Sequence, residues 1–380
     1  MKIAVIVNEL NIRGGTHKQV LRLCQYLKEH NINFVLCTKI YESEKTYKEF
    51  ESFDIISLYD RKSNVEALDQ KHDNQNLFNI IPDDVDIFNV HDNQLNGLIY
   101  LALRKRKKVV WQINDMPSAF HVGVNEKSDH LIKDYLTKLA IKHMAKKIDT
   151  ITVNVSKNKD RVKNGMKRDA KVLYCGVDIN KGLKKHSFSD LGEEFTVLSM
   201  GVFLPYRNYE ALIYSVDKLR REGCKIRLDI IGDTNADVGY AQKIQNMIIE
   251  RKVDKHVKIW GQVDDDIYNK LFNAANAFAF VNIEQSWGLA VFEAMSAGLP
   301  TIVSNSVGAI ELLHHNVDSI ILDPQNIDEI CTILRKLTID ETYYNRISDE
   351  SARAVKEFTW DKLYSSKMLE IFYKLSEEQN

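Results

Sequence analysis

The chain has 380 residues, more than one ordinary hydrophobic core holds, which predicts two or more domains. Its composition, 44% hydrophobic and 28% charged, excludes a disordered or fibrous protein. No apolar run approaches the ~20 residues that span a membrane, and the segment MKIAVIVNEL lacks the apolar core and cleavage site of a signal peptide. Five scattered cysteines without a Cys-x-x-Cys pair argue against a disulfide framework and favour a cytoplasmic protein.

The net charge of −1 hides an uneven distribution along the chain. Residues 1–185 carry a net charge of +9, and residues 186–380 carry −10. A basic half joined to an acidic half suggests that the first half faces an anionic partner. A phosphate-bearing substrate, an acidic membrane surface and nucleic acid are the candidates.

Strand patterns alternate with helix patterns in the first half of the chain. Helical spacing of apolar residues occurs at 16–30, 95–107 and 130–147. The expected strands are 2–7, 33–39, 85–91, 108–114, 150–154 and 171–177. This alternation predicts an α/β domain with a parallel, doubly wound sheet.

A polar, charged stretch at 180–195 is the best candidate for a linker, because the pattern then starts again. The expected strands of the second series are 196–202, 227–233, 257–263, 277–282, 301–305 and 319–323. We therefore expect α/β domains at 1–185 and 186–359. The last helix pattern either caps the second domain or crosses back to the first, and we assign residues 360–380 to the first.

Ligands of open parallel sheets bind beyond the carboxyl ends of the strands, so residues just after strands are the candidate site residues. Gly14–Gly15 lies between the first strand and helix, where backbone N–H groups can meet a phosphate or sugar oxygen. A plain glycine turn is the alternative. Arg207 follows the first strand of the second domain and is suited to clamp a diphosphate, although most single arginines lie on the surface.

The stretch 281–305 is the most informative part of the sequence. A strand is expected to end at Asn282, and a helix to begin near Trp287-Gly288-Leu289, where free N–H groups suit phosphate and hydroxyl recognition. Glu293 is a carboxylate among apolar neighbours. Two interpretations stay open for it: it binds a vicinal diol such as ribose, or it faces solvent on an amphipathic helix.

Within this stretch, EQSWGLAVFEAMSAGLP resembles the signature of the retaining nucleotide-sugar glycosyltransferases of the GT-B fold, most closely glycosyltransferase family 4 (glycosyl transferases group 1). The resemblance implies two Rossmann-like parallel-sheet domains facing an inter-domain cleft, the first for the acceptor and the second for the nucleotide sugar. It extends over almost the whole chain through Gly-Gly at 14–15, NVHD at 89–92, LYCGVDIN at 173–180, SMGVFLPYRNYE at 199–210, IIGD at 230–233 and GQV at 261–263.

The resemblance also implies roles for single residues. Glu293 matches the second Glu of the E-x7-E motif, which binds the ribose hydroxyls. Gln285 stands where the first Glu is expected, so either Gln285 or the preceding Glu284 acts at the sugar. Arg207 matches one of two basic residues on the diphosphate, and Val202 replaces the other. The remaining donor-binding residues implied are Gly14, Gly15, Gly232, Trp287, Gly288 and Leu289.

In the first domain the family commonly has a His that contacts the donor sugar, and Asn114, followed by Asp115, stands at that position. The resemblance thus makes Asn114 a catalytic residue together with Arg207 and Gln285, although an amide is neither acid nor base. His121 substitutes for the missing imidazole or lies on the surface. His91 lines the cleft or has a structural role.

The implied reaction transfers a hexose-type sugar, with retention, from a UDP- or GDP-sugar to a hydroxyl of a glycan or lipid-linked acceptor in polysaccharide biosynthesis. Positive groups stabilise the leaving diphosphate. No dedicated general base is needed if the departing phosphate oxygen helps to deprotonate the acceptor. No metal and no other cofactor are expected.

The basic half has two further interpretations. RKRKK at 104–108 and the lysines within 130–147 attach the protein peripherally to the inner face of an anionic membrane, or they are solvated helix faces. Nucleic acid is not expected, since no recognition motif accompanies the charge. Because Gln285, Val202 and Asn114 depart from the family pattern, a nucleotide-sugar-binding member with weakened or altered catalysis, including a nucleotide-sugar epimerase, is the alternative.

Overall fold

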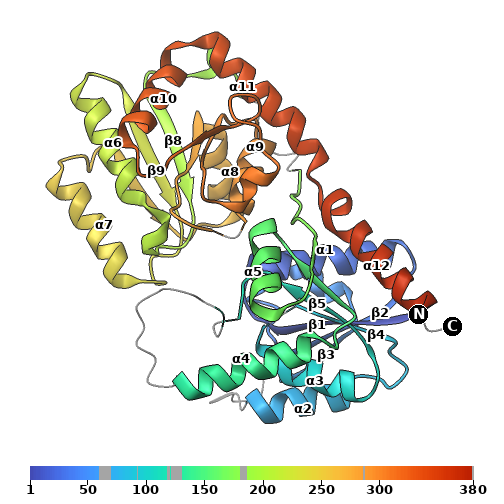
Figure 1. Cartoon of the computed structure of the whole chain (residues 1–380). Helices are drawn as coiled ribbons and strands as arrows, with labels where there is room; N and C mark the ends of the chain where they lie inside the picture. Colours follow the sequence, from blue (N-terminus) through green and yellow to red (C-terminus); the bar gives the residue numbers. More distant parts are fainter. Residues whose placement is uncertain are drawn as a thin grey trace. The chain divides into compact units, whose positions relative to one another are not determined.

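The computed structural model describes residues 1–59, 70–91, 93–117, 120, 131–179, 186–285 and 287–378. The chain forms two compact units (Figure 1): Met1–Gly176 with Trp360–Asn380 make the first, and Val177–Thr359 the second. The boundary after Gly176 precedes the one expected at 185. The N–H of Val177 donates to the carbonyl oxygen of Phe358 at 2.9 Å, which pairs this segment with the end of the second unit.

The first unit contains a parallel seven-stranded sheet in the order β3-β2-β1-β4-β5-β6-β7. The sequence pattern missed β3, a short edge strand whose residues are all only half-buried, so that it lacks a continuous apolar run. The strands are β1 (Lys2–Leu10), β2 (Asn33–Tyr41), β3 (Ile55–Tyr59), β4 (Ile87–Val90), β5 (Lys108–Ile113), β6 (Thr150–Val153) and β7 (Lys171–Val172).

Helices cover both faces of this sheet. In Figure 1, α2, α3 and α4 lie on one side of the sheet, and α1 and α12 on the other. The helices are α1 (Gly15–Glu29), α2 (Gln70–Ile80), α3 (Asn96–Arg104), α4 (Leu131–Ala145), α5 (Ser156–Met166) and α12 (Ser366–Glu377), with a π-helical turn at Asp361–Ser365 and short 3-10 helices at Lys48–Ser52 and Asn93–Leu95.

The second unit contains a parallel six-stranded sheet in the order β10-β9-β8-β11-β12-β13. Its strands are β8 (Phe195–Met200), β9 (Ile226–Ile231), β10 (Val257–Gly261), β11 (Ala277–Phe280), β12 (Thr301–Ser304) and β13 (Ile320–Leu322). Its helices are α6 (Tyr209–Arg221), α7 (Val238–Glu250), α8 (Asp265–Ala274), α9 (Leu289–Ser296), α10 (Ile327–Ile339) and α11 (Glu341–Ala354), with 3-10 helices at Phe188–Asp190, Pro205–Arg207, Gly308–Glu311 and Val355–Glu357.

Each sheet has one topological switch point, where the strand order reverses. It lies between β1 and β4 in the first unit and between β8 and β11 in the second. In doubly wound folds the loops after two such strands lead to opposite faces of the sheet, and the carboxyl edge between them is the preferred ligand position. The fold therefore offers one such position in each unit.

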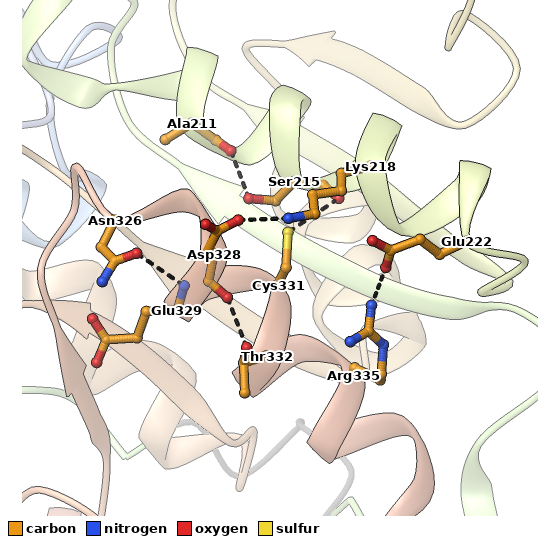
Figure 2. A network of polar contacts seen from close by, with 10 residues as sticks. All are labelled: Ala211, Ser215, Lys218, Glu222, Asn326, Asp328, Glu329, Cys331, Thr332 and Arg335. Atoms are coloured by element: carbon orange, nitrogen blue, oxygen red, sulfur yellow. Dashed lines mark hydrogen bonds and ion pairs between the residues drawn. The ribbon is translucent and has the colours of Figure 1, made fainter.

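Helix α6 begins directly after the loop that carries Arg207, and α10 holds it in place (Figure 2). The Sγ of Cys331 on α10 lies 3.7 Å from the carbonyl oxygen of Ser215 on α6, both buried. At the rim, Lys218 pairs with Asp328 at 2.5 Å, and Arg335 pairs with Glu222. Exposed ion pairs contribute little, so the buried apolar contact between the helices supplies most of the stabilisation.

His91 follows β4 and is only 2% exposed. Its Nε2 donates to Oδ1 of Asn89 at 2.6 Å, and its ring meets the ring of Tyr364 edge-on, with centroids 6.5 Å apart. Burial lowers the pKa of His91 to about 3. Of the two interpretations of His91, this packing against the C-terminal segment supports the structural one.

We predict that acid destabilises the protein through His91. The folded pKa lies below the unfolded value of about 6.5, so stability is full above that pH and falls as pH drops toward 3. At pH 5 the loss is about 2 kcal/mol. Urea unfolding at pH 7.5, 6 and 5 measures it. His91→Gln should flatten the slope and His143→Gln, at an exposed position, should not; equal slopes in wild type and His91→Gln would contradict the prediction.

Candidate functional site

Arg207 occupies the switch point of the second unit. It ends the short 3-10 helix after β8 and is only 9% exposed. Its guanidinium lies against the backbone of Gly201, where a Cβ would come within 2.4 Å of the Arg207 Cζ. Gly201 also has a φ of +154°, so the loop needs glycine there for both its conformation and the room it leaves.

The guanidinium of Arg207 is bracketed by aromatic rings and bonded to a neutral amide. Its Cζ lies 5.1 Å from the ring centroid of Tyr206 and 5.7 Å from that of Phe280. One terminal nitrogen donates to Oε1 of Gln285 at 2.9 Å. Its Nε is buried and has no hydrogen-bond partner among the described residues. A buried cation without a carboxylate partner is costly, and an anionic ligand would offset that cost.

Gln285 is held in place by the loop after β11. Its Oε1 also accepts from Nδ2 of Asn282, and its carbonyl oxygen accepts from the N–H of Gly308 at 3.1 Å. The preceding Glu284 is exposed. Of the two residues that the sequence left open, Gln285 is the one that the structure places on Arg207.

Helix α9 begins beside this pair. Gly288 caps it with a φ of +121°, and a Cβ there would lie 3.1 Å from the Phe280 ring. Trp287 is buried and stacks on Phe292 at 5.2 Å. The first N–H groups of a helix, here those of Leu289 and Ala290, have no acceptor within the helix, whereas the N–H of Val291 donates to the carbonyl oxygen of Gly288. The N–H groups of Leu289 and Ala290 add positive potential to the site of Arg207.

Glu293 lies one turn into α9 and is half-buried. The hydroxyl of Tyr268, on α8, donates to its Oε2 at 3.1 Å. Burial, then the nearby Glu293 carboxylate, raise the pKa of Tyr268 well above its usual value, so the hydroxyl stays a donor. The carboxylate is thus fixed by a neighbour rather than directed freely into solvent.

Gly232, another expected donor residue, follows β9. A Cβ on it would come within 1.8 Å of the Gly201 carbonyl oxygen. That oxygen accepts from the hydroxyl of Tyr209 at 2.7 Å, and the N–H of Gly232 donates to the Gly261 carbonyl oxygen. Glycines therefore let the loops after β8, β9 and β10 touch backbone to backbone behind Arg207.

Asn114 follows β5 in the first unit and is part of a network of amides. Its Nδ2 donates to Oγ1 of Thr16 at 3.1 Å and to Oε1 of Gln19 at 2.8 Å. Its Oδ1 accepts from Gln112 at 2.9 Å, and its carbonyl oxygen from Asn158. Both amide hydrogens are thus occupied, and the side chain ties the start of α1 to β5.

The other expected residues of the first unit are spread around the same edge of its sheet. Gly14 caps α1 in an extended conformation and Gly15 is the first residue of the helix. Asp115 is exposed, and its carbonyl oxygen accepts from Asn93. His121 lies outside the described residues. Within the part of the chain that is described, no group of three His, Cys, Asp or Glu side chains could hold a metal ion.

Tyr206, Asn282 and Tyr268 are site residues that sequence reasoning missed. Each touches a predicted residue: Tyr206 and Asn282 through Arg207 and Gln285, Tyr268 through Glu293. Tyr268 lies twenty-five positions before Glu293 on a different helix, and no local pattern indicates such a contact. Tyr206 directly precedes Arg207 and Asn282 lies three residues before Gln285, so nearness in sequence to predicted residues was an available signal for both.

Comparison with known proteins assigns a family to both parts of the chain. Residues 13–181 match the model of Glycosyltransferase Family 4, and residues 182–354 that of Glycosyl transferases group 1. An uncharacterised glycosyltransferase of Methanocaldococcus jannaschii is 25% identical over 205 residues, about half of each chain. Sucrose synthase 1 of Hordeum vulgare is 30% identical over 138 residues, 34% of this chain and 17% of that one. The matches thus span about half of the first relative's length and 17% of the second's.

Solved structures share the fold along the whole chain. Sucrose-phosphate synthase of Thermosynechococcus elongatus superposes with a TM-score of 0.79 at 15% identity, covering 100% of both chains. HepE of Anabaena in complex with UDP gives 0.76 at 17% identity, over 98% of this chain and 100% of that one. TarM gives 0.77 at 13% identity over 98% of each. With two Rossmann-like domains of the GT-B fold and both family models matched in order, the chain belongs to the family 4, group 1 glycosyltransferases.

Proposed function

We propose that this glycosyltransferase moves a hexose-type sugar, with retention of anomeric configuration, from UDP- or GDP-sugar to a hydroxyl of a glycan or lipid-linked acceptor. The observation that carries the proposal is the buried guanidinium of Arg207, which has no carboxylate partner among the described residues. The diphosphate group of a nucleoside diphosphate is the anion that we expect this guanidinium to bind. The solved structures of HepE with UDP and UDP-glucose support a nucleotide-sugar donor.

In the proposed reaction, the bond between the anomeric carbon and the diphosphate oxygen breaks, and its electron pair stays on the diphosphate. Arg207 and the N-terminus of α9 stabilise the negative charge that develops there. The acceptor oxygen attacks from the same face, and its proton passes to the departing phosphate oxygen. With Arg207 supplying the positive charge, the reaction is proposed to need no metal.

Gln285 keeps the charge of Arg207 available. A carboxylate at this position, 2.9 Å from the guanidinium, would form an ion pair and compete with the diphosphate. The neutral amide orients Arg207 without neutralising it. The departure from the family motif at this position is therefore proposed to favour diphosphate binding, while Glu293, held by Tyr268, binds the ribose hydroxyls.

A second candidate function rests on Asn114. Because both of its amide hydrogens are engaged with Thr16 and Gln19, it is poorly placed to donate to a sugar. A nucleotide-sugar-binding protein with weakened or altered catalysis, including epimerisation, would fit this arrangement. Slow or absent turnover despite tight nucleotide binding would favour this second candidate.

The surface of α4 supports peripheral attachment at the cytoplasmic, anionic face of a membrane. Tyr135, Leu136 and Leu139 are 63%, 59% and 44% exposed, and lysines Lys138, Lys142, Lys146 and Lys147 follow on the same helix and its end. Apolar side chains enter the interface while lysines meet lipid phosphates. Within the described part of the chain, no helix combines the length and apolarity that crossing a bilayer requires.

Nucleotide binding is expected to depend on Glu293. Titration with UDP, GDP and ADP should raise the melting temperature for at least one of them. Glu293→Ala should raise the Kd of that nucleotide about ten-fold or more by removing two ribose contacts, and Tyr268→Phe should raise it less. Glu293→Ala should also lose the preference for the nucleotide over its 2′-deoxy form. Glu193→Ala, at an exposed position, is the control; an unchanged Kd in Glu293→Ala refutes the ribose assignment.

Turnover is expected to depend on Arg207. The rate of hydrolysis of the nucleotide sugar without acceptor, monitored through the released nucleoside diphosphate, measures this turnover. Arg207→Ala should lower kcat by roughly 10²–10³, as for the loss of one charge-stabilising donor, and Gln285→Glu should raise the donor KM. Lys255→Ala, at an exposed position, should change neither. Wild-type kinetics in folded Arg207→Ala would show that the diphosphate binds elsewhere.

Membrane attachment is expected to need both charge and apolar contact at α4. The protein should sediment with vesicles of phosphatidylglycerol but not of phosphatidylcholine, and less at high salt. The triple variant Tyr135→Ser, Leu136→Ser, Leu139→Ser should bind less, whereas Ile249→Ser, at an exposed position on α7, should bind like wild type. Equal sedimentation of wild type with both vesicle types would remove the support for this surface.

A further inference from the structure

Asn208 joins Arg207 to helix α6 in a conformation that is uncommon for a residue other than glycine. Its φ of +57° and ψ of +39° lie in the left-handed region, which asparagine tolerates better than most residues. Asparagine at the start of a helix commonly accepts a hydrogen bond from an N–H of the first turn. The side chain of Asn208 makes no such bond to α6. Capping of the helix therefore does not explain this asparagine.

The amide of Asn208 is bonded instead to the segments that follow two other strands. Its Nδ2 donates to the carbonyl oxygen of Val281, after β11, at 3.1 Å and to that of Pro324, after β13, at 2.8 Å. Both partners can only accept, so the atom that faces them is the amide nitrogen. In the sheet order β8-β11-β12-β13, these bonds reach from the loop after β8 to the far edge strand. Asn208 thus anchors this loop along the carboxyl edge of the sheet.

The backbone on the other side of Arg207 is held as well. The carbonyl oxygen of Tyr206 accepts from the N–H of Ile283 at 2.8 Å. The side chain of Arg207 itself bonds Gln285, in the same loop after β11. Residues 206, 207 and 208 therefore each have a hydrogen bond to the stretch 281–285. Asn208 adds the bond to the loop after β13, so that its side chain joins three loops.

An anchor is needed here because Arg207 is a buried cation whose side-chain partner is a neutral amide. Arg207 is 9% exposed, and such a group gains free energy by moving toward water when no anion is bound. The bonds of Asn208 oppose that movement. We propose that Asn208 is a positioning residue, which keeps the guanidinium of Arg207 where the diphosphate meets it. This role rests on the proposed function, because Asn208 acts on the diphosphate through Arg207.

The test compares two substitutions of Asn208 in the full-length protein. Asn208→Gly keeps the left-handed conformation and removes both bonds. Asn208→Asp keeps the size and the ability to cap a helix, but it turns an oxygen toward two carbonyl oxygens. Each variant should lower kcat for hydrolysis of the nucleotide sugar about ten-fold and raise the Kd of UDP or GDP. Lys252→Gly is the matched control, since this exposed residue also has a φ of +57°, and it should change neither value.

A double-mutant cycle shows whether Asn208 acts through Arg207. In the Arg207→Ala background, Asn208→Asp should change kcat and Kd by less than about two-fold, because the side chain that Asn208 positions is missing. A merely structural role would instead multiply the two losses. Melting temperatures check the folding of every variant, and Asn208→Gly replaces Asn208→Asp in the cycle if the latter does not fold.

The outcomes separate this proposal from the proposed function. Wild-type kcat and Kd in either folded Asn208 variant, together with a loss in Arg207→Ala, would overturn the role of Asn208 alone. Equal losses for Asn208→Asp in the two backgrounds would overturn it too. Wild-type kinetics in Arg207→Ala would refute the diphosphate site and with it this proposal. If no nucleotide sugar is hydrolysed, the Kd values of UDP and GDP decide, and binding of neither nucleotide would refute both proposals.

Discussion

The second unit is organised around one buried positive charge. The guanidinium of Arg207 is removed from water by Tyr206, Phe280 and the Gly201 backbone, yet its hydrogen-bond partner in the structure is a neutral amide. Such a group is costly in the unliganded protein. Two parts of the structure hold Arg207 in position. Glycines at the ends of three strands let the loops after those strands pack closely behind Arg207, and α10 packs against α6, the helix that follows Arg207. A site built this way orders little on binding, which favours an anion of defined shape.

The two units share one architecture but differ in the charge of the side chains described at their switch points. Both sheets reverse their strand order once, and both place polar side chains at that point. In the second unit the side chains surround a cation, whereas in the first they are amides, with Asn8 donating to Gln94 at 2.8 Å. The cation suits the diphosphate that is proposed to bind there. The lysines of the first unit named above belong to a different element, α4 and its end.

Most of the fold could be predicted from the sequence, because buried parallel strands are near-continuous apolar runs. Twelve of the thirteen strands were expected within a few residues, and β3 was missed because its residues are half-buried at an edge. The GT-B family was indicated by the 285–293 motif and by its order with other motifs, and the family comparisons confirm it. The hydrogen-bond partners of the side chains could not be predicted. Asn114 donates hydrogen bonds to Thr16 and Gln19. Tyr268 donates one to Glu293, and Asn8 donates one to Gln94. Each of these contacts joins distant segments, and nothing in the sequence indicates them.

The return of the chain to its first unit has a consequence for dissecting the protein. After Thr359 the chain supplies the π-helical turn and α12, whose Met368 and Tyr364 pack against Asn89 and His91 of β4 and its loop. A gene fragment that stops at Gly176 would therefore encode a sheet with one face only partly covered, because α1 would remain and α12 would be missing. A single proteolytic cut after Gly176 or after Thr359 would leave the two units covalently linked through the remaining connection. The N-terminal domain is thus a discontinuous folding unit, and only a design that joins both of its segments would isolate it.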